Sequence, residues 1–140
     1  MNRIYHTWDK WECYPAGFYA TKPPKNMTVD QAKRAYAEFL ACDWKFAAAA
    51  DWLITTWKNS CEHYLTNEKM NRIAWVRQAS MCIDSGVSKY FCGGYFLLSQ
   101  EQRDRADQIA LDAINKWMLK NGYEKLSMEQ ALGKSKADLY

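Results

Sequence analysis

Cys61 and His63 are the side chains of this sequence whose types and spacing come closest to a reactive site, with Glu62 between them. A structural zinc ion takes four ligands and a catalytic one takes three, whereas the only other histidine of the chain is His6. A cysteine nucleophile needs a general base beside it, and side chains two residues apart on a helix point to different sides. We therefore predict no metal and no cofactor, and a small thiol- or metal-dependent enzyme at Cys61 and His63 is the third hypothesis for function.

Other catalytic patterns are similarly incomplete. Gly93 and Gly94 are not followed by the Gly-Lys-Ser/Thr of a phosphate-binding loop, and no strand is predicted before them, so the pair indicates a turn with positive φ. The acidic residues fall on predicted polar helix faces, at caps or beside lysines, which is typical of a solvated surface. We therefore predict no catalytic residue and a protein that is not an enzyme.

The charges of the chain are balanced, with 19 Lys and Arg against 16 Asp and Glu and a net charge of +3. Residues 1–27 have the largest basic excess, four against two. A duplex-DNA binder neutralises about six to ten phosphates through a concentrated basic face, and protein mimics of nucleic acid are strongly acidic, so neither class fits this chain. The near-neutral charge favours a protein surface as the partner.

Aromatic residues are concentrated at the N-terminus, where six of the 21 rings in this 140-residue chain fall within the first nineteen positions. Each ring buries about 150–250 Å² when packed, and Trp and Tyr dominate the energetic centres of protein interfaces. We predict that five of these residues bind a partner: Trp8, Trp11, Tyr14, Phe18 and Tyr19. Two alternatives stay open, because the same rings could form a lid over the helices or, beside Arg3 and Lys10, stack on single-stranded bases.

Helix-start signals recur along the rest of the sequence. Three capping boxes, in which Ser or Thr is followed three residues later by Gln, begin at Thr28, Ser99 and Ser127. Asp43 is a further candidate N-cap. Apolar residues at helical spacing follow each of these positions, so each one predicts a helix.

Four long helices are the main predicted elements. They cover about 29–41, Asp43 to Trp57, 68–84, and Ser99 to Gly122. Asn59 and Ser60 break the second helix and cap a short turn at 61–65, while Asn67 starts the third helix and Gly86 ends it.

The predicted fold class is all-α, because no alternating pattern of convincing strand length occurs. We expect one domain over residues 1–140, a compact bundle of four main helices plus one or two short ones. An irregular aromatic arm at 1–27 packs on this bundle, residues 87–98 form a loop, and the tail at about 134–140 frays.

Three polar residues interrupt the third helix, whose apolar residues occupy more than one face, so that this helix should run through the middle of the fold. Polar groups in such a place must either be paired or open onto a binding cleft. The three are Asn71, Arg72 and Arg77. The two arginines are therefore added to the predicted partner-binding residues.

The sequence predicts a protein of the cytoplasm. The N-terminus has no apolar run of signal-peptide length, and the most apolar stretch, 46–57, is shorter than the roughly 20 residues of a membrane span. Five cysteines without a Cys-x-x-Cys pair are typical of reduced thiols. The oligomeric state is not specified by any of these patterns.

Several segments of the chain together resemble a family of small proteins from phages and mobile elements. They are Tyr5–Tyr14, Ala16–Tyr19, Trp57–Asn67, Met70–Trp75 and the Gly93-Gly94-Tyr95 motif with Leu97-Leu98-Ser99. The resemblance implies a biological setting, a phage or mobile element, and not a mechanism. No activity is assigned to that family, so it implies no catalytic residue at any position of this sequence.

These observations favour a non-enzymatic phage or mobile-element binding protein that inhibits or modulates a host protein complex. A defence system such as a CRISPR or restriction complex is the expected type of target, which would make the chain similar to an anti-CRISPR protein. Its location would be the host cytoplasm. The second hypothesis is an accessory protein associated with nucleic acid, which would use the same aromatic arm.

Overall fold

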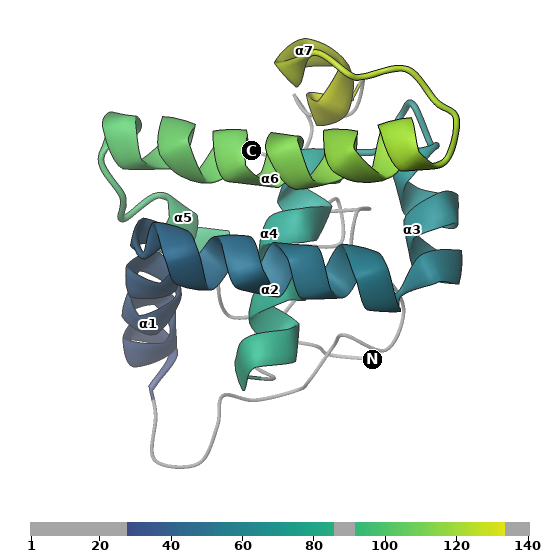
Figure 1. The fold of residues 1–140 in the computed structure, drawn as a ribbon. Coiled ribbons are helices and arrows are strands. Elements are labelled where there is room, and N and C mark those ends of the chain that lie inside the picture. The colour runs from purple at the N-terminus through teal and green to yellow at the C-terminus, as the bar shows by residue number, and fades with distance from the viewer. Residues whose placement is uncertain (1–27, 86–91, 134–140) are drawn as a thin grey trace, which may run out of the picture.

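The computed structural model describes residues 28–85 and 92–133, and every regular element in these two ranges is a helix (Figure 1). The helices are α1 (Val29–Ala41), α2 (Asp43–Thr56), α3 (Lys58–Leu65), α4 (Arg72–Ser85), α5 (Cys92–Tyr95), α6 (Gln100–Lys120) and α7 (Met128–Leu132). The predicted all-α class is confirmed for this part of the chain. The predicted arm at 1–27, the tail at 134–140 and the helix end at Gly86 lie outside the described residues.

All three predicted capping boxes are present. In the first, the Gln31 backbone N–H donates to the Thr28 hydroxyl at 3.1 Å, and the Thr28 N–H donates to the Gln31 side-chain oxygen at 2.8 Å. Ser99 and Ser127 begin α6 and α7 in the same way. Each box satisfies two backbone donors at a helix start, so the local sequence suffices to place these three starts.

The start of α2 differs from the prediction, because Cys42 rather than Asp43 is the N-cap. The Cys42 N–H donates to carbonyls of the last turn of α1, so α2 follows α1 without a loop. Asp43 becomes the first helical residue, and its carboxylate accepts a hydrogen bond from Arg105 of α6 at 2.7 Å. This contact with α6 occupies the carboxylate that capping would have needed.

The predicted break at Asn59 and Ser60 is wrong, since both residues lie inside α3 and the chain turns at Trp57. Trp57 has a φ of −96° and a ψ of 58°, outside helical values, and its side chain packs against the core. The turn brings the Cys61 thiol to 3.7 Å from the carbonyl oxygen of Ile54 on α2. Burial of one face of α3 therefore decides where this helix begins.

The start of α4 lies at Arg72, later than predicted. Asn67, the predicted start, forms a turn in which its side-chain oxygen accepts from the Lys69 backbone N–H at 3.0 Å. The side chain of Asn71 accepts from the Ala74 N–H at 2.9 Å, as an N-cap does. Asn67 and Asn71 are thus both candidate N-caps for α4. Asn71 caps the helix, because the residues between the two asparagines form the turn.

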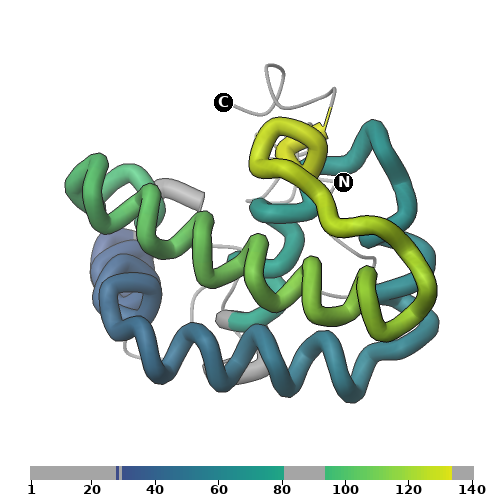
Figure 2. The backbone as a smooth tube through the Cα atoms, turned by 45° about the horizontal axis from the view of Figure 1, so that its top comes forward, coloured from purple at the N-terminus to yellow at the C-terminus, as the bar shows by residue number. Residues whose placement is uncertain are grey.

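The α4 helix crosses α2 and α6 in the middle of the fold, as predicted (Figures 1 and 2). Every residue from Met70 to Ser80 is buried. The ring of Trp75, the largest fully buried side chain, stacks on Tyr64 of α3 with the centroids 5.2 Å apart. The α2 and α6 helices also pack on each other, so the three helices enclose one core.

Gly94 lies in the short helix α5, where a turn with positive φ was predicted. Positive φ occurs instead at Gly122, which ends α6 as predicted, and at Gly133 among the described residues. A Cβ on Gly94 would lie 2.5 Å from the Lys33 carbonyl oxygen and 2.8 Å from Cδ2 of Tyr36. The position requires glycine because α5 packs closely on α1, and not because of its backbone conformation.

Candidate functional site

Both arginines among the residues predicted to bind a partner lie on α4 within the described part of the chain. The aromatic residues of the arm lie outside it: Trp8, Trp11, Tyr14, Phe18 and Tyr19. Arg72 and Arg77 are five residues apart, and each meets different neighbours.

Arg77 lies inside the fold, with 1% of its side chain exposed. Its Nε lies 3.6 Å from Oδ1 of Asp107 on α6, and its guanidinium lies over the Tyr95 ring, 3.7 Å from the centroid. The Tyr95 hydroxyl donates to Oδ2 of Asp107 at 2.7 Å. A polar residue on this helix was expected either to be paired or to open onto a cleft, and Arg77 is paired. Its contacts with Tyr95 and Asp107 join α4 to α5 and α6.

The Asp107 carboxyl gives this cluster a pH dependence. Burial raises the pKa of Asp107, and the Arg77 charge and the Tyr95 hydrogen bond lower it without cancelling that effect. A carboxyl with a higher pKa in the folded state contributes stability that is complete below its unfolded pKa and is lost as pH rises through its folded pKa. The stability of the wild type relative to Asp107→Asn should therefore be greatest in acid and should decline toward neutral pH. Urea unfolding of both proteins between about pH 3 and 7 measures this difference, and a difference that grows with pH would contradict it.

Arg72 is also buried, with 4% exposed, but its environment differs. Its Nη1 donates to the Leu65 carbonyl at 2.8 Å, and its Nη2 donates to the Gln130 carbonyl at 2.9 Å. Both carbonyls belong to the last turns of helices, α3 and α7, where partial negative charge favours a cation. Burial lowers the pKa of Arg72 and the charge of Glu68 raises it. Its Nε has no hydrogen-bond partner among the described residues.

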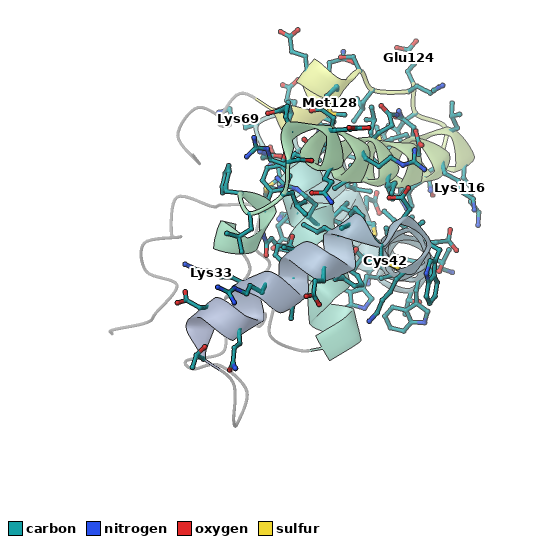
Figure 3. The ribbon with its side chains drawn as sticks, turned by 90° about the vertical axis from the view of Figure 1, so that its left-hand side faces the viewer. Lys33, Cys42, Lys69, Lys116, Glu124 and Met128 are labelled. Carbon is teal, nitrogen blue, oxygen red and sulfur yellow. The ribbon has the colours of Figure 1, made fainter. Side chains whose placement is uncertain are left out.

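The α7 groove is an open hollow of about 1270 Å³ beside Arg72, formed by the start of α4, the end of α6 and α7. Its apolar lining consists of Met118, Tyr123, Leu126, Met128 and Leu132. Two exposed carboxylates, Glu68 and Glu129, also line it. Figure 3 labels Met128 on the α7 side of α6 and Cys42 on the α2 side. Arg72 joins the end of α3 to α7 beside the groove, so it is a positioning residue for the groove.

A second surface was missed by the sequence reasoning. Trp44 and Trp52 are 74% and 48% exposed on the outer side of α2, while Phe46, Ala50 and Leu53 of the same helix are buried. The sequence did contain a signal for this surface. The two tryptophans are eight residues apart and fall opposite the apolar stripe of this helix, a position that predicts exposure.

Cys61 and His63 are not brought together by the fold. Cys61 is fully buried, its thiol faces the Leu53 and Ile54 carbonyls, and burial raises its pKa to about 12. His63 is exposed, and its ring contacts the Tyr64 ring edge-on, with the two ring centroids 4.7 Å apart. A thiol with this pKa is protonated at neutral pH and is a poor nucleophile, so the geometry does not support the enzyme hypothesis.

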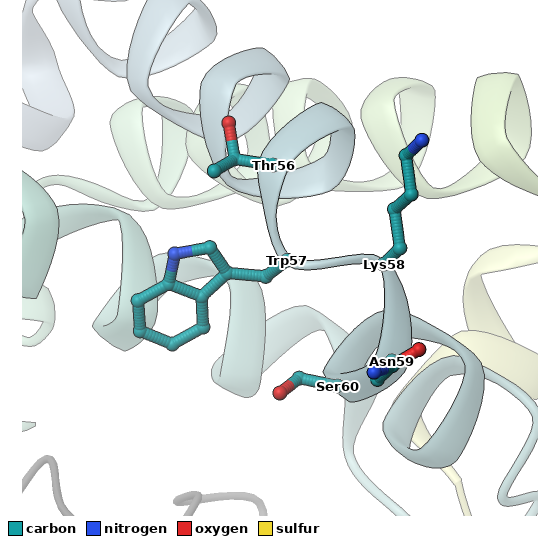
Figure 4. A pocket seen from close by; sticks show the side chains of 5 residues that line it. All are labelled: Thr56, Trp57, Lys58, Asn59 and Ser60. Atoms are coloured by element: carbon teal, nitrogen blue, oxygen red, sulfur yellow. The ribbon is translucent and has the colours of Figure 1, made fainter.

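The junction of α2 and α3 holds a smaller hollow of about 380 Å³ (Figure 4). Its lining comes from five consecutive residues, Thr56 to Ser60. Figure 4 shows the Trp57 ring and the Lys58 side chain pointing away from each other. Because no pair of polar groups converges here from different elements, this hollow has no arrangement suited to catalysis.

Within residues 28–85 and 92–133, no cluster of three or more His, Cys, Asp or Glu side chains could hold a metal ion. None of the helices in these ranges combines the length and apolar character needed to cross a bilayer. The α7 groove and the outer face of α2 are candidate surfaces for partner binding.

No protein-family model matches the chain, and no curated protein or solved structure is significantly similar to it.

Proposed function

We propose that this chain is a non-enzymatic binding protein that holds a segment of another protein in the α7 groove. The observation that carries the proposal is a groove of about 1270 Å³ whose apolar lining includes two methionines and whose walls are tied by a buried arginine. Methionine side chains adapt to varied apolar shapes and are common on peptide-binding surfaces. The volume exceeds that of an ordinary small-molecule site, about 300–1,000 Å³, and is sufficient for several side chains of a peptide.

The groove also suggests the chemistry of the bound segment. Its apolar lining would accept an apolar anchor such as Leu or Phe, since such anchors dominate peptide recognition in grooves. Glu68 and Glu129 are exposed residues of its lining, whereas Arg72 is buried. A segment with apolar anchors and a flanking Lys or Arg therefore complements the groove better than an acidic one.

The biological setting is part of the same proposal. Because the sequence resembles small phage and mobile-element proteins, we propose that the partner belongs to a host complex, such as a defence system, which the chain inhibits or modulates in the host cytoplasm. We propose that the N-terminal arm packs on the helices and makes a second contact through Trp8, Trp11 and Tyr14. Trp and Tyr are the residue types that most often carry binding energy at interfaces.

A nucleic-acid-associated role has less support from the described surface. Arg105 and Lys116 are exposed basic residues of α6, but they pair with Asp43 and Asp51 at 2.7 and 3.2 Å. Pairing of this kind reduces the concentrated positive charge that phosphate binding needs. Affinity for RNA or DNA that falls steeply with added salt would favour that role over the protein-binding one.

A charge placed in the groove is expected to weaken partner binding at least about tenfold, because a carboxylate must lose its hydration against the apolar anchor. Met128→Glu makes this change in a partly buried position of the groove. The partner is first recovered with the wild-type chain from the native host, then purified and titrated against both proteins by calorimetry.

The matched control is Leu97→Glu, which adds the same carboxylate at an exposed apolar residue between α5 and α6. It should bind like the wild type. Unchanged binding by Met128→Glu would refute the groove proposal. The arm is tested separately by replacing Trp8, Trp11 and Tyr14 with alanine: loss of binding with an unchanged melting temperature supports contact, and a large fall in melting temperature supports a lid.

A further inference from the structure

The second of the two described ranges ends at a residue of the α7 groove. Gly133 directly follows α7 and belongs to the lining of the groove. Its φ is 74°, and a Cβ there would overlap the Met70 carbonyl group, so close packing fixes the position of this residue. The tail at 134–140 lies outside the described residues, but its first residue is bonded to Gly133. The tail is therefore tethered at the groove by one end.

The tail has the chemistry that the groove is expected to bind. Its sequence is Lys-Ser-Lys-Ala-Asp-Leu-Tyr, with two lysines, one acidic residue and Leu139 as an aliphatic anchor. In an extended chain, successive side chains point to opposite sides. Lys134 and Lys136 would then share one side, while Ala137 and Leu139 would share the other. One side of the tail therefore suits an apolar lining, and the other side suits acidic groups.

The charges of the groove favour this segment. Glu68 and Glu129 are exposed carboxylates of its lining. Arg72, the cation among the described lining residues, is buried, and both of its Nη atoms donate to carbonyls of the fold. The charge that the groove presents to a bound segment is therefore negative, and it attracts Lys134 and Lys136.

The tether distinguishes the tail from a free segment of similar composition. Leu139 is six residues beyond Gly133 and can reach about 20 Å from it. Met128 of the groove is five residues before Gly133, about 8 Å along α7, so it lies within this reach. A short flexible tether gives an effective concentration in the millimolar range. Even a tail that binds with only millimolar affinity would then fill the groove about half of the time.

We propose that the tail occupies the α7 groove of its own chain and competes there with the partner segment. This competition regulates the proposed binding site and so rests on the proposed function. A groove that the tail fills about nine times in ten would bind the partner about tenfold more weakly than an empty one. The tail was predicted to fray because of its polar residues; in the proposed arrangement, its lysines instead meet Glu68 and Glu129.

Methyl NMR of the full-length chain tests the occupancy of the groove without any partner. Met118 and Met128 line the groove, so their methyl resonances report what lies in it. The protein is labelled at its methionine methyl groups. Leu139→Ser removes the apolar anchor, and Lys134→Glu/Lys136→Glu reverses the charge of the tail. Both variants should move the two resonances in the same direction, toward their positions in the empty groove.

A second pair of reversals tests which charges the tail meets. Glu68→Lys/Glu129→Lys makes the groove positive, so in this background the reversal of the two lysines should move the same resonances toward the occupied position instead. The shifts should also be the same from about 20 µM to 1 mM, because binding within one chain does not depend on concentration. Shifts that grow with concentration would place the tail in the groove of a second copy and overturn the proposal.

Arg34→Glu/Lys58→Glu is the matched control, since it reverses two exposed basic residues that do not line the groove. It should leave both methionine resonances in place. Circular dichroism should be unchanged in all variants, which separates a loss of tail binding from unfolding. Resonances that do not respond to any of the tail variants would overturn the proposal.

The purified partner separates this proposal from the proposed function. Leu139→Ser frees the groove and should bind the partner about twofold to tenfold more tightly than the wild type, whereas Met128→Glu should bind it more weakly. Wild-type affinity in Leu139→Ser would overturn the competition. Because the methionine resonances are measured without the partner, they still show whether the tail binds if Met128→Glu reveals that the partner binds elsewhere. The two failures are therefore distinguishable.

Discussion

Replacing Trp75 with alanine is expected to lower the free energy of unfolding by about 3–5 kcal/mol. Trp75 is fully buried on the central helix α4, and its ring stacks on Tyr64 at 5.2 Å. Alanine would lose these contacts and leave a cavity where α4 meets its neighbours, which cannot close without moving them. Domains of this size are stable by about 5–15 kcal/mol, so the variant should unfold at a much lower urea concentration than the wild type.

Trp75→Phe is the matched control for this change. The indole N–H of Trp75 is buried and has no acceptor among the described residues, so phenylalanine removes an unsatisfied donor while retaining most of the ring. We expect a loss of less than about 1.5 kcal/mol. If Trp75→Ala cost no more than Trp75→Phe in urea unfolding, the central packing of α4 described above would be incorrect.

Replacing Gly94 with valine is expected to cost about 3 kcal/mol, and replacing it with alanine somewhat less. Its Cβ would lie 2.5 Å from the Lys33 carbonyl oxygen, a backbone atom that cannot rotate away, and 2.8 Å from the Tyr36 ring. The α5 helix would have to move away from α1. Urea unfolding gives the loss of stability, and the near-ultraviolet circular dichroism of Tyr36 and its neighbours reports the displacement.

Gly122 provides the comparison, because it needs glycine for a different reason. Its φ is 85°, and a Cβ there would have no atom within 4 Å. Asparagine tolerates this backbone region, so Gly122→Asn should cost well under 1 kcal/mol, whereas Gly94→Asn should be as harmful as Gly94→Ala. Equal losses at the two glycines would contradict the distinction between close approach and positive φ.

The sequence was a good guide to helix starts that depend on local hydrogen bonds. The boxes at Thr28, Ser99 and Ser127 were predicted correctly, because each needs only residues three apart. Boundaries that depend on packing were predicted poorly. The chain turns at Trp57 rather than at Ser60, since the bend there buries one face of α3 against α2.

The candidate site was partly predictable. The sequence identified Arg72 and Arg77 as polar residues on a buried helix that had to be paired or to line an opening. It did not show that Arg77 meets Asp107 of α6, or that Arg72 is bound by the Gln130 carbonyl 58 residues away. The other residues that line the α7 groove were not predicted, because they come from the segment before α4, from the end of α6 and from α7 and its flanking residues.

By itself, the sequence determined the all-α class of the described residues, the capped helix starts and the central place of α4, because apolar spacing and caps act within a few residues. The tertiary structure decided which polar and aromatic groups remain accessible. Trp75 is buried and Trp44 is exposed, although both are tryptophans on helices. The helical spacing already placed Trp44 opposite the apolar stripe of α2, but only the packing of the helices decided that no other described element covers that side.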